Sequence, residues 1–87
     1  MIFDEKTLEY LQSRTSPTRA LLLAMLNSGA AIPSDDMCKA VAHLSKVGGL
    51  SKGEKLRILN IQLHRLKKEL ARVVDIETVT SRRMVLK

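Results

Sequence analysis

Three cationic side chains recur along one stretch of the chain at spacings that a single helix face can hold. Arg57, Arg65 and Lys68 follow one another at intervals of eight and three residues, and on a helix they lie opposite a stripe of leucines. Such groups neutralise phosphates. Arg65 and Gln62 can also make paired hydrogen bonds to guanine and adenine, and Ile61 can pack on thymine methyl groups. These side chains indicate a surface that binds double-stranded DNA.

The net charge of +6 is unevenly distributed along the chain. Residues 1–50 carry five basic and five acidic side chains, whereas residues 51–87 carry ten basic and four acidic ones. All of the excess positive charge therefore lies in the C-terminal part. This asymmetry indicates a polyanionic partner, with nucleic acid as the first candidate and an acidic protein or a membrane surface next.

Catalytic and metal-binding chemistry has little support in this sequence. Cys38 is the only cysteine, so an internal disulfide is excluded and a buried thiol in a reducing compartment is expected. His43 and His64 have no acidic residue or thiol at a recognisable catalytic or metal-binding spacing. Asp35 and Asp36, adjacent on a helix, point about 100° apart and suit the helix N-terminus better than a shared ion. We expect no enzyme activity, no cofactor and no metal site.

Membrane insertion is not expected from the distribution of apolar residues. The longest apolar run, "ALLLAML" at residues 20–26, is much shorter than the roughly 18 residues of a membrane span. The opening "MIFDEKTLEY" lacks the basic start and apolar stretch of a signal peptide. We therefore expect a cytoplasmic protein that does not contact a membrane.

Capping signals predict two helices in the first half of the chain. The first runs from Pro17 to about Asn27, because Ser16 can cap its start and Gly29 can end it in a left-handed conformation. The second begins at Pro33-Ser34 and ends at "SKVGG". Its inward side chains are expected to be Met37, Cys38, Val41 and Leu44.

A third and longest helix is predicted from Lys52 to about Ala71, starting at a capping box formed by Ser51 and Glu54. Its periodicity predicts a core seam of leucines at 56, 59, 63, 66 and 70. The opposite side is basic with two isoleucines set into it, and comprises Arg57, Ile58, Ile61, Arg65, Lys68 and Arg72.

The two ends of the chain differ in how clearly they can be interpreted. In residues 73–87, β-branched residues flank the polar "TSRR", which predicts a hairpin with Arg82 and Arg83 near its tip. Residues 1–15 fit two alternatives, a short helix capped by Asp4 with Leu8 and Leu11 inward, or a weak strand pair. We expect an N-terminal arm, as partial sheet or helix, over residues 1–15 and a domain of three helices and a hairpin over residues 16–87.

Three segments resemble the OmpR/PhoB-type winged helix-turn-helix DNA-binding domains. "SPTRALLLAMLNSGAAIPSDDMCKAV" resembles their "TPTE...LL..L....G..VSRE.L...V" opening, "RILNIQLHRLKKEL" their "RTVDVHISRLRKKL" helix, and "DIETVTSRRMVLK" their "IETVRGxGYRL" wing. The resemblance covers residues 16–87. It implies that the third helix lies in the major groove and that the hairpin, as a wing, reaches the minor groove or the backbone.

The family's DNA-contacting positions carry over residue by residue. Arg57, Ile61, Gln62, Arg65 and Lys68 match positions of the family's recognition helix, and Thr78 matches a wing threonine. The family's wing arginine is replaced by Thr80, its glycines by Ser81 and Arg83, and its Tyr-Arg pair by Met84-Val85, so Arg82 and Arg83 would have to supply the lost charge. The resemblance implies six DNA-binding residues, and the charge of the hairpin adds Arg82 and Arg83. The predicted DNA-binding residues are therefore Arg57, Ile61, Gln62, Arg65, Lys68, Thr78, Arg82 and Arg83.

Together, the residues and the resemblance predict a mainly α protein with a small β-hairpin, a winged helix-turn-helix of three helices and a C-terminal wing. The expected function is sequence-specific binding of double-stranded DNA as a transcriptional regulator. The alternative is a winged-helix protein-interaction module, in which Ile58 and Ile61 dock on RNA polymerase, another regulator or a second copy. The loop 46–52 is a second candidate partner surface. A homodimer and tandem binding both remain open.

Overall fold

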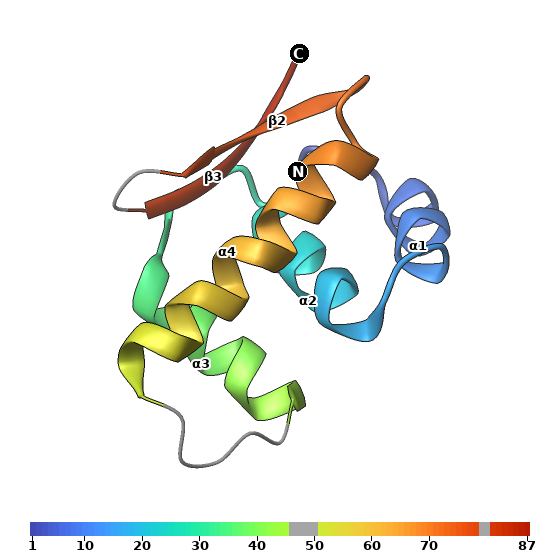
Figure 1. Ribbon diagram of the computed structural model, residues 1–87. Helices are drawn as coiled ribbons and strands as arrows, with labels where there is room; N and C mark the ends of the chain where they lie inside the picture. Colours follow the sequence, from blue (N-terminus) through green and yellow to red (C-terminus); the bar gives the residue numbers. More distant parts are fainter. Residues whose placement is uncertain (46–50, 79–80) are drawn as a thin grey trace.

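The computed structural model describes residues 1–45, 51–78 and 81–87, except for the side chains of Leu44, Ser45 and Thr78. Its helices enclose a core that a small antiparallel sheet of strand order β1-β3-β2 completes (Figure 1). Among the described residues, no helix is both long enough and apolar enough to cross a membrane. The elements are α1 (Glu5–Ser13), α2 (Pro17–Leu26), β1 (Ile32–Pro33), α3 (Ser34–Ser45), α4 (Lys52–Glu69), β2 (Val74–Thr78) and β3 (Ser81–Leu86).

The N-terminal segment forms a helix, so the strand alternative is wrong. The side chain of Asp4 caps α1 by accepting a hydrogen bond from the backbone N–H of Thr7 at 2.8 Å. Hydrogen bonds from Thr7, first from its side chain and then from its backbone, lower the pKa of Asp4. Leu8 and Leu11 are half-buried against the core, as predicted. The helix thus forms locally and docks through one apolar edge.

A buried asparagine ties the chain start to the end of α2. The Phe3 N–H donates to Asn27 Oδ1 at 2.7 Å, and Asn27 Nδ2 donates to the Phe3 carbonyl at 3.1 Å. Asn27 is 4% exposed, and Phe3 belongs to the same buried cluster as the leucines of α2 and α4. Residues before α1 therefore share the core of the rest of the chain.

The predicted start and end of α2 are confirmed. Ser16 caps the helix by accepting from the Arg19 backbone N–H at 3.3 Å, Pro17 occupies the first turn, and Gly29 follows the helix with a φ of 79°. Because its central residues are apolar on several sides, α2 lies at the centre of the core. Its fully buried side chains are Leu22, Leu23 and Leu26.

α4 begins where predicted and has about the predicted length, but two of its side chains differ from the prediction in their burial. Ser51 caps the helix by accepting from the Glu54 N–H at 3.3 Å. Leu56, predicted in the core, is 37% exposed, whereas Ile58, predicted on the outer side, is half-buried against the core. The core thus covers Ile58 and leaves Leu56, near the start of the helix, at the surface. The buried leucines are Leu59, Leu63, Leu66 and Leu70.

The predicted hairpin is present, and a third strand that the sequence did not indicate pairs with it. β2 and β3 are antiparallel, with Ile76 opposite Met84. β1 occupies residues that were expected to lead directly into a helix, and it pairs Ile32 with Arg82 and Pro33 with Ser81. A two-residue strand has no periodicity to detect, and proline is tolerated there because β1 is an edge strand. The turn at residues 79–80 lies outside the described residues.

Candidate nucleic-acid interface

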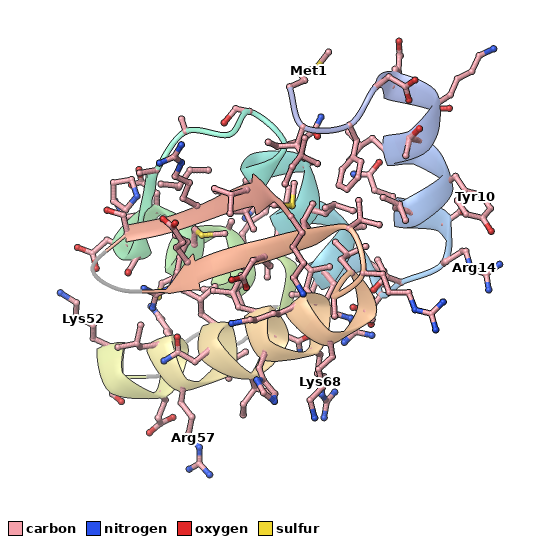
Figure 2. All side chains as sticks on the ribbon, turned by 90° about the horizontal axis from the view of Figure 1, so that it is seen from above. Met1, Tyr10, Arg14, Lys52, Arg57 and Lys68 are labelled. Atoms are coloured by element: carbon pink, nitrogen blue, oxygen red, sulfur yellow. The ribbon has the colours of Figure 1, made fainter. Side chains whose placement is uncertain are left out.

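The face of α4 directed away from the core carries most of the predicted DNA-binding side chains. Arg57, Arg65 and Lys68 are exposed, and Ile61 among them is 42% exposed. Figure 2 shows Arg57 and Lys68 extending from the same side of α4, away from the hairpin strands. The structure thus brings together four of the eight predicted site residues on one surface, which we call the α4 outer face.

The positive charge of the α4 outer face is not neutralised within the described part of the chain. The side chains of Arg57, Arg65 and Lys68 make no hydrogen bond or ion pair with any described residue. By contrast, Lys67, on the flank toward the hairpin, pairs with Asp75 at 3.2 Å. The hydrogen bond from Lys67 is the main reason that the pKa of Asp75 is lowered. The cations of the outer face remain available for an external anion.

A shallow hollow runs along the first half of the α4 outer face. Exposed apolar side chains at Leu56 and Ile61 form part of its lining, and Asn60 and His64 lie between them and the arginines. Its lining residues are Gly53, Leu56, Arg57, Asn60, Ile61, His64 and Arg65. The hollow therefore combines an apolar floor with hydrogen-bond donors, a combination that suits base edges carrying a methyl group or acceptor atoms.

Gln62, for which a bidentate contact with adenine was predicted, does not join this face. It is half-buried on the flank toward α2, where its Oε1 accepts a hydrogen bond from Arg19 Nη1 at 3.0 Å. Arg19 is held in turn by Glu69 Oε1 at 3.0 Å and by Thr15 Oγ1 at 2.9 Å. A bidentate adenine contact needs the amide oxygen of Gln62, which is already engaged. Gln62 instead helps to fasten α4 to α2.

The two hairpin arginines lie at the start of β3, as expected of residues near the tip, but their side chains point in opposite directions. Arg82 is 4% exposed and donates from Nη2 to Asn60 Oδ1 at 3.0 Å. Arg83 is exposed and donates from Nε to the Gly29 carbonyl at 3.2 Å. Successive residues of a strand alternate between its two faces, so adjacent arginines cannot share one. The side chain of Thr78, the predicted wing contact, lies outside the described side chains.

Two polar residues outside the predicted set also belong to this site: Asn60, which sequence reasoning left out, and His64, which it interpreted as a surface or phosphate-contacting residue. Both are exposed and line the hollow beside Ile61. Their spacing from Arg57, three and seven residues, is a helical signal that was available in the sequence. The pairing of Asn60 with Arg82 had no such signal, because it joins residues of different elements.

The only cysteine lies away from this face and is buried. Cys38 is 8% exposed. Burial, and next the negative charge of Asp35, raises the pKa of the thiol, while the positive charges of Arg82, Lys52 and Lys55 act in the opposite direction. Within the described residues, no three side chains among the histidines, cysteines and acidic residues are placed to hold a metal ion.

No protein-family model, curated protein or solved structure matches this chain. The resemblance to OmpR/PhoB-type domains therefore depends on the quoted sequence motifs alone.

Proposed function

We propose that this chain is a winged helix-turn-helix protein that binds double-stranded DNA with α4 in the major groove and acts as a transcriptional regulator. The observation that carries the proposal is the α4 outer face, where Arg57, Arg65 and Lys68 are exposed and make no ion pair with the described residues. The opposite side of the helix is held in the core by four buried leucines. A rigid helix with one free cationic face is suited to a polyanionic groove.

The order and pairing of the elements support a winged helix-turn-helix. After α1, the chain runs α2, β1, α3, α4, β2 and β3, and β1 pairs with the hairpin that follows the longest helix. In this proposal α2, α3 and α4 are the three helices of the motif, and the hairpin of β2 and β3 is the wing. Arg83, which uses only one of its donors on Gly29, would contact the backbone from this wing.

The dimensions of α4 suit the proposed mode of binding. Its 18 residues span about 27 Å at about 1.5 Å per residue, and a major groove about 12 Å wide admits a single helix. Arg57 and Lys68 lie toward opposite ends of the face and would contact phosphates, while Arg65 would read guanine and Ile61 a thymine methyl group. Affinity and sequence preference would thus come from different side chains.

The test compares two double variants that each remove one arginine and one lysine. Bound sequences are first selected from random duplex DNA, and affinity for a selected duplex is then measured by fluorescence anisotropy. Arg65→Ala/Lys68→Ala should lower that affinity at least about tenfold, because it removes a base contact and a phosphate contact. The matched control, Lys6→Ala/Arg14→Ala in α1 and at its C-cap, should stay within about twofold.

Two results would refute the proposal. One is failure of the wild-type chain to retain any duplex at low salt, where phosphate contacts are strongest. The other is an equal loss of affinity in the α4 variant and the α1 control, since that would mean that overall charge, and not this face, attracts the DNA.

A second candidate function has one specific observation in its favour. Leu56 and Ile61 are 37% and 42% exposed and line the same hollow, and an exposed apolar pair with a polar rim is also typical of a protein interface. In this alternative the face binds RNA polymerase or another regulator. Residues 46–50 of the candidate partner loop lie outside the described residues. Binding of a protein partner that Ile61→Asp abolishes, with no retention of DNA at low salt, would favour this alternative.

A further inference from the structure

Asn60 lies where the hollow of the α4 outer face meets the sheet beneath it. The residue is exposed and lines the hollow, yet its Oδ1 accepts a hydrogen bond from Arg82 Nη2 at 3.0 Å. A guanidinium group has five donors and no acceptor. The amide must therefore turn its oxygen toward Arg82, and its amino group is directed elsewhere.

The position of Arg82 is set by the sheet and not by α4. Arg82 lies in β3, the central strand, with Ile32 of β1 and Thr78 of β2 as its pairing partners. Its side chain is on the same side of the strand as the buried Met84, and it is itself 4% exposed. A charged side chain that is buried and hydrogen-bonded is costly to release. Arg82 is thus a fixed donor beneath Asn60.

The amino group of Asn60 is left as a donor at the hollow. Among the described residues, none accepts a hydrogen bond from Asn60 Nδ2. Arg57 and Arg65, which line the same hollow, are also donors without acceptors. No carboxylate of the described residues lines it. His64, which also lines the hollow, can supply one ring nitrogen as an acceptor. The other polar groups of this part of the α4 outer face are donors.

Base edges in the major groove differ in how they meet such a surface. Guanine presents two acceptors, N7 and O6, and no donor, whereas thymine presents one acceptor, O4, beside its methyl group. Adenine presents N7 together with an amino donor, and cytosine presents an amino donor, and these donors need an acceptor on the protein. An asparagine reads adenine by using its oxygen and its amino group together. Arg82 already engages the oxygen of Asn60, so that mode is disfavoured here.

We propose that Asn60 is a specificity-determining residue that reads the acceptor edge of guanine, and that Arg82 is the positioning residue that holds it in the donor orientation. This inference rests on the proposed binding of duplex DNA by α4. It replaces the adenine contact expected of Gln62 with a guanine contact at a different residue.

The test uses a duplex selected by the wild-type chain, in which each guanine is replaced in turn by 7-deazaguanine. This base lacks the N7 acceptor but keeps its pairing. One or more positions should lose about five- to tenfold in affinity, as expected for a lost hydrogen bond. Replacing each adenine in turn by 7-deazaadenine is the control, and no loss of affinity that it causes should depend on Asn60.

The variant Asn60→Asp separates the reading of a base from the support of the fold. A carboxylate still accepts from Arg82, so the packing partner is kept, but the outward donor is lost. The added negative charge lowers affinity for every duplex, and this common loss cancels in the ratio between guanine and 7-deazaguanine duplexes. At one guanine position the ratio should fall to about one, while the remaining positions keep the ratios of the wild type.

A second variant tests the positioning role of Arg82. Arg82→Met keeps an unbranched side chain in the buried space but releases the Asn60 amide, which can then rotate and use its oxygen. At the position identified with Asn60→Asp, the preference for guanine over adenine should fall severalfold, with other positions unaffected. An unchanged preference would overturn the role of Arg82.

Failure of this inference is distinguishable from failure of the proposed function. If duplexes are retained and the loss in Arg65→Ala/Lys68→Ala exceeds that of its control, only the reading role can fail. It is wrong if neither the sensitivity to 7-deazaguanine nor the preference for guanine over adenine at any position depends on Asn60. If the Asn60-dependent position proves to be adenine, the donor orientation is wrong. If no duplex is retained at low salt, both proposals fall.

Discussion

The substitution Asn27→Ala tests whether the chain start is part of the folded core. Asn27 is 4% exposed and pairs with both backbone groups of Phe3, at 2.7 and 3.1 Å. Alanine would leave a buried N–H and a buried C=O without these partners, at a cost of about 1–3 kcal/mol each. Because the segment can partly undock and regain water, we expect a total loss of about 2–4 kcal/mol in the free energy of unfolding.

Urea titration followed by far-UV circular dichroism measures this loss. A chain of this size typically unfolds with about 4–13 kcal/mol, so the shift in midpoint should be large. The neighbouring Ser28→Ala is the control, since it removes two exposed hydrogen bonds, one to the Met25 carbonyl at 3.4 Å and one from the Ala30 N–H at 3.3 Å. Because both groups can bond to water instead, it should cost no more than about 0.5 kcal/mol. Adding Asn27→Ala to a chain without residues 1–3 should likewise cost little, because both partner groups are already gone. A loss below about 0.5 kcal/mol for Asn27→Ala in the full chain would refute the reasoning.

Three further predictions concern charge and burial. In Arg57→Ala/Lys68→Ala, the slope of log affinity against log salt concentration should become shallower by about 1.8. Raising the salt concentration from about 50 to 200 mM should then cost about tenfold less affinity than it does in the wild type. An unchanged slope in anisotropy titrations would contradict phosphate contacts by these two side chains. The Lys67 hydrogen bond lowers the pKa of Asp75, so the ionised carboxylate contributes to the free energy of unfolding above the ordinary pKa of 3.8. This contribution is lost as the pH falls below that value. In that range the urea midpoint should therefore decline less steeply in Asp75→Asn than in the wild type. The Cys38 thiol, buried and with a raised pKa, should react with a chromogenic disulfide reagent at pH 8 far more slowly in the native state than in urea, and equal rates would show that it is accessible.

The helix boundaries could be predicted because their causes lie within a few residues of sequence. Asp4, Ser16 and Ser51 each accept from a backbone N–H three residues later, and Gly29 adopts the left-handed φ that ends α2. These interactions need no partner from another element. For the same reason β1 at residues 32–33 could not be predicted, because it exists only through its pairing with β3.

The periodicity of α4 placed its residues relative to one another but not relative to the core. The leucine stripe correctly identified the buried side, yet Leu56 at its edge is 37% exposed and Ile58 packs inward. Helical geometry fixes the angle between two side chains. Which sector is covered depends on where α2, α3 and the sheet lie, and that is settled by packing across the whole chain.

The sequence by itself determined where the helices begin, which stretch carries the positive charge, and that Arg57, Ile61, Arg65 and Lys68 share one exposed face. Only the tertiary structure decided that Arg82 is buried against Asn60, and that Gln62 turns toward Arg19. The reason is physical. Capping and periodicity act between near neighbours in the chain, whereas a hydrogen bond between residues 22 or 43 positions apart depends on which elements the core brings into contact.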